Sequence, residues 1–233
     1  MTFQDRQSDS PFIERVWRCR GNQGGPFLSV AAANLELVLT RLAGMSVVTL
    51  RGPETRATPI FCPAGGEWVA VRFRLGVYLP MLPTGRMLDH ADVTLPVTDG
   101  WFHLGDSSWE LLDFDNAEAL VAGLAGRGVI AKDPAVTAIV RDEPAGLTSR
   151  SVQRHFQRAT GMTHGMLRRI ERARQATNLL RAGMPILDAV HEAGYFDQAH
   201  LSRSVKMLIG QTPAQIARGD AQLSFLYKTG RDP

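Results

Sequence analysis

One short segment near the C-terminus gathers polar side chains that can bond both the bases and the phosphates of a nucleic acid. Within residues 186–206 they fall on one face of an expected helix, and they are Gln198, His200, Ser202, Arg203 and Lys206. An amide, an imidazole and a guanidinium can bond base edges, and an ammonium bonds phosphate oxygens. A lone histidine is more often a surface or core residue, so the whole face carries the interpretation.

Two helices and a tight turn would hold this polar face in place. The first helix is predicted by apolar residues at the spacing of one helix face, which are Ile186, Ala189, Val190 and Ala193. Gly194 follows, and glycine takes the left-handed conformation that commonly ends a helix. Asp197 is a good N-cap for the second helix. The buried side of that helix is predicted to comprise Leu201, Val205 and Leu208. The pattern is typical of a helix-turn-helix.

The passages GYFDQAHLSR and GQTPAQI, in this order, resemble the second helix-turn-helix of the AraC/XylS family of bacterial transcription regulators. The resemblance extends back to about Gly146. It implies an all-helical domain in which two helix-turn-helix units are joined by a linker helix, so that one chain can address two successive major grooves of double-stranded DNA. It therefore implies a sequence-specific DNA-binding transcription regulator.

The resemblance also implies roles for individual residues. In the second unit the base readers would be Gln198, Ala199, His200 and Arg203, whereas Ser202 and Lys206 would contact phosphate. In the first unit the passage LTSRSVQRHFQRATG resembles the first recognition helix. Its exposed face would carry Arg150, Gln153 and Arg154, followed by Arg158 as a contact to the DNA backbone.

Helix signals in the back half support this arrangement, with one departure. Thr148 or Ser149 can cap a helix that ends at Gly161, and residues 166–182 read as the linker helix. Thr212 opens a capping box before a terminal helix. The departure lies in the passage DPAVTAIVRDEPAG, which has prolines at 134 and 144 and room for one short helix at best. Sequence discrimination is therefore expected mainly from the second unit.

The front half is expected to be rich in strands. Apolar residues alternate with others in 35–40 and 69–75, and 47–50 and 93–97 are further candidates. This pattern suits sheets with one buried face, in a small sandwich or barrel. A helix is predicted from Asp115 or Asn116 to Gly126 or Gly128, burying Leu120, Val121 and Leu124 and leading to a linker at 132–134.

The expected fold class is therefore α+β, with a β-rich domain at 1–132 and a helical DNA-binding domain at 133–233. The passage RGPETRATPIFCPAGGEWVAVRFRLGVYLPMLP resembles, more distantly, the β-rich N-terminal domains of AraC-type regulators. That resemblance implies a module for sensing an unidentified small molecule or for forming a homodimer.

Charge divides the chain in the same way. Residues 1–133 carry twelve Lys and Arg against fifteen Asp and Glu, whereas 134–218 carry twelve against six. A basic helical segment suits a polyanion such as DNA, although a solvated basic face would look the same.

Three alternatives stay open. A helix-turn-helix with a degenerate first unit could serve as a protein-interaction or nonspecific DNA-binding module. A metal-dependent β-barrel enzyme would need converging ligands, but His90 and His103 lack nearby histidine partners and suit surface loops. Cys62 as the acceptor of a repair methyltransferase lacks a general base, so Cys62 and Cys19 are expected to be packing residues. With no cofactor motif, signal peptide or long apolar run, we expect a cytoplasmic protein with no enzyme activity, no cofactor and no membrane association.

Overall fold

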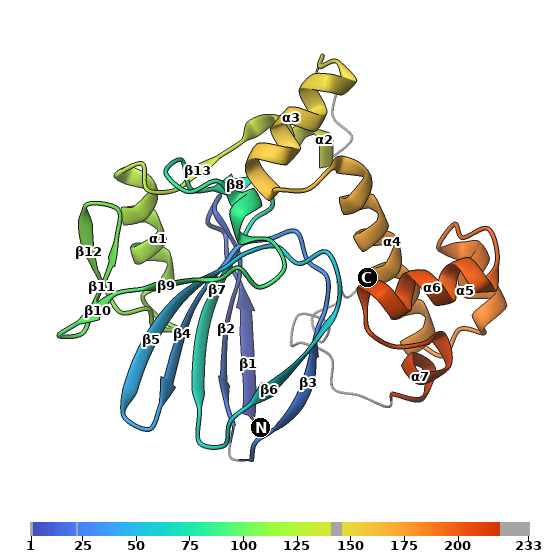
Figure 1. Ribbon diagram of the computed structural model, residues 1–233, viewed down its shortest axis with the longest axis horizontal. Helices are drawn as coiled ribbons and strands as arrows, with labels where there is room; N and C mark the ends of the chain where they lie inside the picture. The colour runs from blue at the N-terminus through green and yellow to red at the C-terminus, as the bar shows by residue number, and fades with distance from the viewer. Residues whose placement is uncertain (1, 22, 141–145, 220–233) are drawn as a thin grey trace. The chain divides into compact units, whose positions relative to one another are not determined.

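A β-rich region precedes a helical region in the computed structural model, which describes residues 2–21, 23–140 and 146–219 (Figure 1). The α+β fold class is therefore confirmed. The chain divides into two compact units. Among the described residues, the first consists of 2–21, 23, 33–53, 63–140 and 146–164, and the second of 24–32, 54–62 and 165–219. The proposed domain boundary between residues 132 and 133 stays a prediction.

The main sheet of the first unit has six antiparallel strands. In spatial order they are β1 (Thr2–Gln7), β2 (Ile13–Arg20), β7 (Glu67–Phe73), β4 (Glu36–Leu42), β5 (Met45–Arg51) and β9 (Val93–Leu95). A smaller sheet holds β10 (Val97–Thr98), β11 (Trp101–Leu104) and β12 (Ser107–Glu110). The strands expected in 35–40, 47–50 and 69–75 are confirmed. The strand expected at 93–97 is divided, because Pro96 has no N–H with which to continue the ladder.

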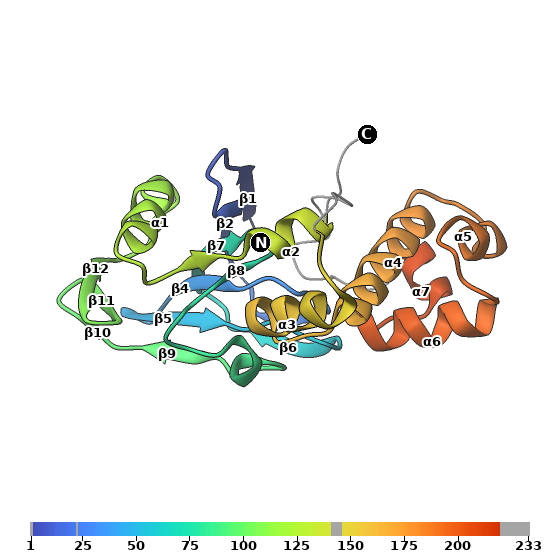
Figure 2. The same cartoon turned by 90° about the horizontal axis from the view of Figure 1, so that it is seen from above.

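One face of this sheet forms the main hydrophobic core. Leu37, Leu39 and Val71 are at most 1 % exposed and pack in one cluster with α1 (Ala117–Gly126), which lies on this side of the sheet in Figure 2. Asn116 occupies the N-cap position of α1, and the helix buries Leu120, Val121 and Leu124. The helix prediction is therefore confirmed.

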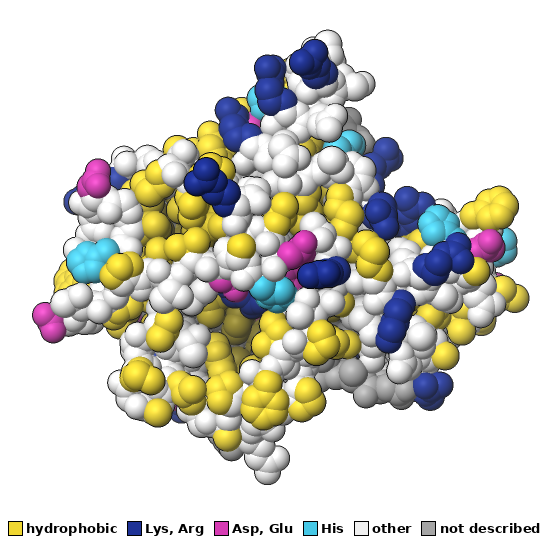
Figure 3. All heavy atoms as spheres, viewed as in Figure 1, with side chains coloured by type: hydrophobic (Ala, Val, Ile, Leu, Met, Phe, Trp, Pro, Cys, Tyr) yellow, Lys and Arg dark blue, Asp and Glu magenta, His cyan; other side chains and the backbone are white. Residues whose placement is uncertain are grey.

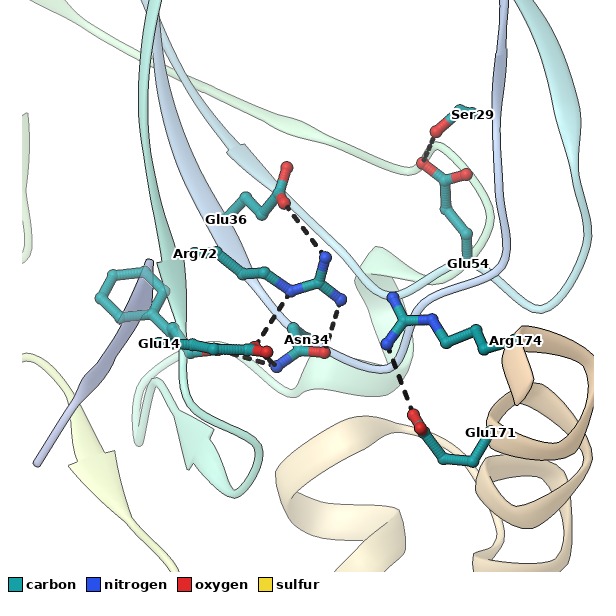
Figure 4. Close-up of polar contacts among 9 residues, drawn as sticks. Glu14, Ser29, Asn34, Glu36, Glu54, Arg72, Glu171 and Arg174 are labelled. Atoms are coloured by element: carbon teal, nitrogen blue, oxygen red, sulfur yellow. Dashed lines mark hydrogen bonds and ion pairs between the residues drawn. The ribbon is translucent and has the colours of Figure 1, made fainter. Parts of the chain in front are cut away.

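The opposite face is buried as well at its centre, so the expectation of a single buried face is wrong. Ala70 is fully buried and Arg72 is only 3 % exposed. Arg72 stands directly across from Glu36 in the register of β7 and β4. Its guanidinium lies 3.1 Å from the Glu14 carboxylate and 3.9 Å from that of Glu36, and it donates a 2.8 Å hydrogen bond to Asn34 (Figure 4). This pairing allows charged residues, which the pattern assigned to solvent, to be buried.

The expected linker at 132–134 is a built part of the first unit. β13 (Ala131–Lys132) pairs with β8 (Val77–Tyr78), and Asp133 is 1 % exposed. α2 (Pro134–Val140) follows at once, which confirms one short helix in this segment; Pro144 lies outside the described residues. The segment is ordered because the Asp133 N–H donates to the Gly76 carbonyl and the Asp133 carboxylate accepts several hydrogen bonds.

Five helices make up the described chain after residue 146, and their ends follow the local signals. They are α3 (Ser149–Thr160), α4 (His164–Arg181), α5 (Ile186–Glu192), α6 (Gln198–Leu208) and α7 (Pro213–Arg218). Thr148 caps α3, Gly161 ends it in the left-handed conformation, and Thr212 forms the expected capping box. Among the described residues, no helix has the length and apolarity needed to cross a membrane.

The second unit contains two strands from the front half of the sequence. β3 (Gly25–Ser29) and β6 (Thr58–Cys62) pair as an antiparallel ribbon, and this β3–β6 ribbon belongs to the same compact unit as α4 to α7. α3 belongs to the first unit, where it packs against α2, β8 and the 3-10 turn η1 (Thr84–Met87).

Candidate nucleic-acid interface

A tight turn sets the direction of α6 relative to α5. Gly194 has a φ of 68°, the left-handed conformation that was predicted, and the Tyr195 N–H donates to the Val190 carbonyl at 2.8 Å. Asp197 then adopts an extended conformation and accepts a 2.6 Å hydrogen bond from the His200 N–H. This side chain satisfies one of the unpaired donors of the first turn, so α6 begins where the sequence predicted.

The buried side of the helix pair is apolar. Ala189 and Val190 of α5 are buried, as are Leu201, Val205 and Leu208 of α6. Because these positions are fixed in the core, the other side of α6 must face outward. It carries Gln198, Ala199, His200, Arg203 and Lys206, all exposed, with Ser202 half-buried beside them. The structure therefore brings the six residues predicted for the second helix-turn-helix unit together on one accessible face.

His200 is held by a contact that the sequence analysis missed. Its ring meets the Tyr195 ring edge-on, with 5.0 Å between ring centres. Tyr195 is itself buried, and its hydroxyl lies 2.9 Å from Ser204 Oγ. Burial raises the pKa of the Tyr195 hydroxyl despite this hydrogen bond, so the phenol stays neutral. Tyr195 therefore links the turn to α6, and its ring packs against the imidazole of His200.

Arg172 of α4 completes this support. Its guanidinium lies 5.4 Å from the centre of the Tyr195 ring and donates a 3.2 Å hydrogen bond to the Gly194 carbonyl. A cation over an aromatic face is favourable, and the hydrogen bond fixes the same turn. An aromatic residue directly after the turn glycine was visible in the sequence, but nothing local pointed to its partner on α4.

The C-terminal end of α6 is held by residues that flank the two strands of the β3–β6 ribbon. The Ala31 N–H donates to the Leu208 carbonyl, and the Ala57 N–H donates to the Met207 carbonyl, both at 2.8 Å. The last carbonyls of a helix have no partner within it, so these two bonds satisfy groups that would otherwise need a cap. Lys206 donates a 3.1 Å hydrogen bond to the Gly210 carbonyl at the same end. No local sequence pattern indicates this contact.

The helices α4 to α7 carry an excess of basic residues. Between positions 164 and 219 the chain has eight Lys and Arg against four Asp and Glu, and basic side chains gather over α4 and α6 (Figure 3). Glu171 and Arg174 form a 3.4 Å ion pair along α4 (Figure 4), which removes one of these charges from the free surface. The remaining excess would attract a polyanion and would make its binding dependent on salt.

The predicted DNA-binding residues of the first helix-turn-helix unit divide into two groups. Arg150, Gln153 and Arg154 are exposed on α3. Arg158, by contrast, donates a 2.6 Å hydrogen bond to the Asp133 carboxylate and lies over the Tyr78 ring. His155 Nδ1 is 2.8 Å from the same carboxylate. Arg158 therefore already has partners within the first compact unit, and its contact to DNA stays a prediction.

The two histidines of the front half lie in different surroundings. His103 lies exposed on β11, and its Nδ1 is 3.0 Å from Ser108 Oγ; the expected surface loop is in fact a strand. His90 is half-buried with a left-handed φ of 73°. Within the described ranges, no three His, Cys, Asp or Glu side chains are grouped so that they could hold a metal ion.

A protein-family model matches part of the chain. Residues 143–219, which include α3 to α7, match the model of a protein family described as a helix-turn-helix domain. No curated protein matches the chain, and no solved structure matches it either. The match supports an AraC-type helix-turn-helix domain in this part of the chain, and such a domain indicates a DNA-binding transcription regulator rather than an enzyme.

Proposed function

We propose that the chain is a sequence-specific transcription regulator that reads double-stranded DNA mainly with α6. The observation that carries this proposal is the exposed face of α6, on which amide, imidazole, guanidinium and ammonium groups stand together. The N-terminal residues of a recognition helix contact base edges, and Asp197 and Tyr195 hold that end of α6 in place.

The roles follow from position and chemistry. Gln198 and His200 lie in the first turn and would bond base edges, and Arg203 could bond guanine through two hydrogen bonds. Ala199 is small enough to let the helix approach the groove. Lys206 uses one ammonium donor on Gly210 and keeps two for phosphate, which Ser202 would also contact.

We assign a supporting role to α3. Arg150, Gln153 and Arg154 are exposed and would contact phosphate, which fixes register without reading sequence. Two helix-turn-helix units in one chain remain part of the proposal, with α4 as the linker helix. Because Arg158 is hydrogen-bonded to Asp133, we expect α3 to take its orientation from contacts within the first compact unit.

The β-rich region would sense a small molecule or form a homodimer. The cluster of Arg72 with Glu14, Glu36 and Asn34 supports the first role, because the Glu14 side chain is 46 % exposed and gives the cluster a polar group that a ligand could reach. A change in this sheet would need to reach α6, and the β3–β6 ribbon, whose strands join those of the sheet along the chain, ends on that helix.

Selection of binding sites from random duplex DNA, followed by gel-shift measurements with the full chain, tests the function. Specific sites normally bind about 10³-fold or more tightly than random DNA. We expect one sequence to be enriched and to bind at least ~100-fold above random DNA at moderate salt. Binding that never exceeds random DNA by ~10-fold would instead establish a nonspecific or protein-interaction module.

A further inference from the structure

Phe196 is the most exposed large hydrophobic residue among those described, with 90 % of its surface accessible. It lies in the turn between α5 and α6, directly before the N-cap Asp197. A hydrophobic residue at this place commonly packs against the fourth residue of the helix and so fixes the entry of the chain. Here that fourth residue, Leu201, is fully buried whereas Phe196 is almost fully accessible, so Phe196 does not serve this purpose.

The backbone on both sides of Phe196 is held firmly. Before it, Tyr195 is fixed by its hydroxyl contact to Ser204 and by the bond from its N–H to Val190. After it, the Asp197 side chain accepts the His200 N–H. An aromatic side chain is therefore displayed from a rigid position. Such preorganisation lowers the conformational entropy that binding would cost.

The surroundings of Phe196 indicate what it contacts. It directly precedes the first turn of α6, where Gln198, Ala199 and His200 are all exposed. The major groove presents one apolar group to a protein, the 5-methyl group of thymine, and Phe and Ala are among the side chains that contact it. Phe196 and Ala199 provide apolar surface beside polar groups, as a site for thymine among bonded bases would require.

We propose that Phe196 selects a thymine by packing against its 5-methyl group at one end of the sequence read by α6. This inference rests on the proposed DNA-reading function and adds a specificity-determining residue that hydrogen-bonding chemistry does not reveal. Removing one methyl contact is worth about 0.8 kcal/mol of apolar burial, which corresponds to roughly a fourfold change in affinity.

The test uses the full chain and its own selected DNA sequence. Each thymine is replaced in turn by deoxyuridine, which lacks only the methyl group, and affinities are measured for the wild type and for Phe196→Ala. We expect one position at which replacing thymine with deoxyuridine lowers the affinity of the wild type roughly fourfold and leaves the affinity of Phe196→Ala unchanged. At that position the variant should also lose its preference for thymine in a repeated selection.

Two controls separate the outcomes. Leu187→Ala removes another exposed apolar side chain of the same unit and should keep the wild-type response to deoxyuridine. Phe196→Ala should unfold at the wild-type temperature, because the side chain is exposed. If both proteins respond alike to every deoxyuridine, or if Phe196→Ala binds as the wild type does, the thymine contact is refuted and a protein partner for Phe196 becomes the better assignment. If the wild type selects no sequence at all, the proposed function fails together with this inference.

Discussion

Arg158 of α3 donates a 2.6 Å hydrogen bond to the carboxylate of Asp133, which is fully buried at the start of α2. His155 approaches the same carboxylate from one turn earlier on α3. One acidic side chain therefore joins the helix that resembles a first recognition helix to the strand pair β8 and β13. This relationship makes a measurable prediction about stability.

Replacing Asp133 with Asn should lower the free energy of unfolding by about 1 to 2 kcal/mol at neutral pH, less than a fully buried charged bond because Arg158 is half exposed. Burial raises the pKa of Asp133, but the hydrogen bonds and charges of His155 and Arg158 outweigh it and lower the pKa overall. A carboxyl with a lowered folded pKa stabilises fully above its unfolded pKa, about 3.9, and loses this effect as the pH falls through the folded value.

The difference between wild type and Asp133→Asn should therefore shrink as the pH falls below about 4. Urea unfolding followed across this range measures it. Asp106→Asn, which changes an exposed carboxylate in the turn between β11 and β12, provides the control. A difference that stayed constant down to pH 2 would show that the carboxylate charge has no part in holding α3.

Arg203 and Lys206 should differ in how they affect DNA binding. Arg203→Ala should cost about 1 to 3 kcal/mol at one base pair and relax the preference there, because a base contact is lost. Lys206→Ala should weaken binding to all sequences alike and reduce the dependence on salt by about one counterion. Gel shifts on the selected site and on single-base variants, at several salt concentrations, distinguish the two. Equal losses on every sequence for both variants would contradict the assigned roles.

Two substitutions at Tyr195 should separate its hydroxyl from its ring. Tyr195→Phe removes the contact to Ser204 and should cost about 1 kcal/mol of stability, while the ring still supports His200. Tyr195→Leu also removes the ring, so both Arg172 and His200 lose their contact with it.

We therefore expect the selected DNA to bind Tyr195→Phe nearly as tightly as wild type and to bind Tyr195→Leu several-fold more weakly. Affinities are compared at a temperature where both variants are folded, as judged by circular dichroism. Equal affinities for the two variants would mean that the ring does not position His200.

Gly210 and Gly219 allow the ribbon contact to be separated from backbone strain. Both have a positive φ, 86° and 72°, so an alanine at either position is strained by about 1 kcal/mol or more. At Gly210 a Cβ would also lie 3.1 Å from Leu28 and 3.2 Å from Ala57 of the ribbon segments, whereas at Gly219 it would meet nothing. Thermal unfolding should therefore show a larger loss for Gly210→Ala. If Gly219→Ala is the more damaging change, the ribbon does not pack closely against the end of α6.

The sequence was most informative where structure depends on neighbours in the chain. Gly194, Asp197 and Thr212 act through the conformation of a single residue or through hydrogen bonds within three residues, so the turn and the helix starts could be predicted. The polar face of α6 follows from the same local pattern, because its buried positions recur at the helical period.

Features that depend on distant partners could not be predicted in this way. Glu36 and Arg72 appear as polar positions of alternating strands, and only their pairing across β4 and β7 explains their burial. The support of His200 involves Arg172 on another helix. The β3–β6 ribbon is separated from α6 by most of the chain, and no local pattern marks its strands as part of the helical unit.

The ribbon also sets an order of events during synthesis. Its two strands and the flanking residues Ala31 and Ala57 leave the ribosome long before α6 is made. Until then the Ala31 and Ala57 N–H groups lack their acceptors, the Leu208 and Met207 carbonyls. Contacts between such distant segments form slowly, and an unpaired ribbon is an exposed template for pairing with other chains. We expect the nascent protein to be most prone to aggregation until its last helices are made. A C-terminal fragment expressed without residues 24–32 and 54–62 would lack these partners permanently.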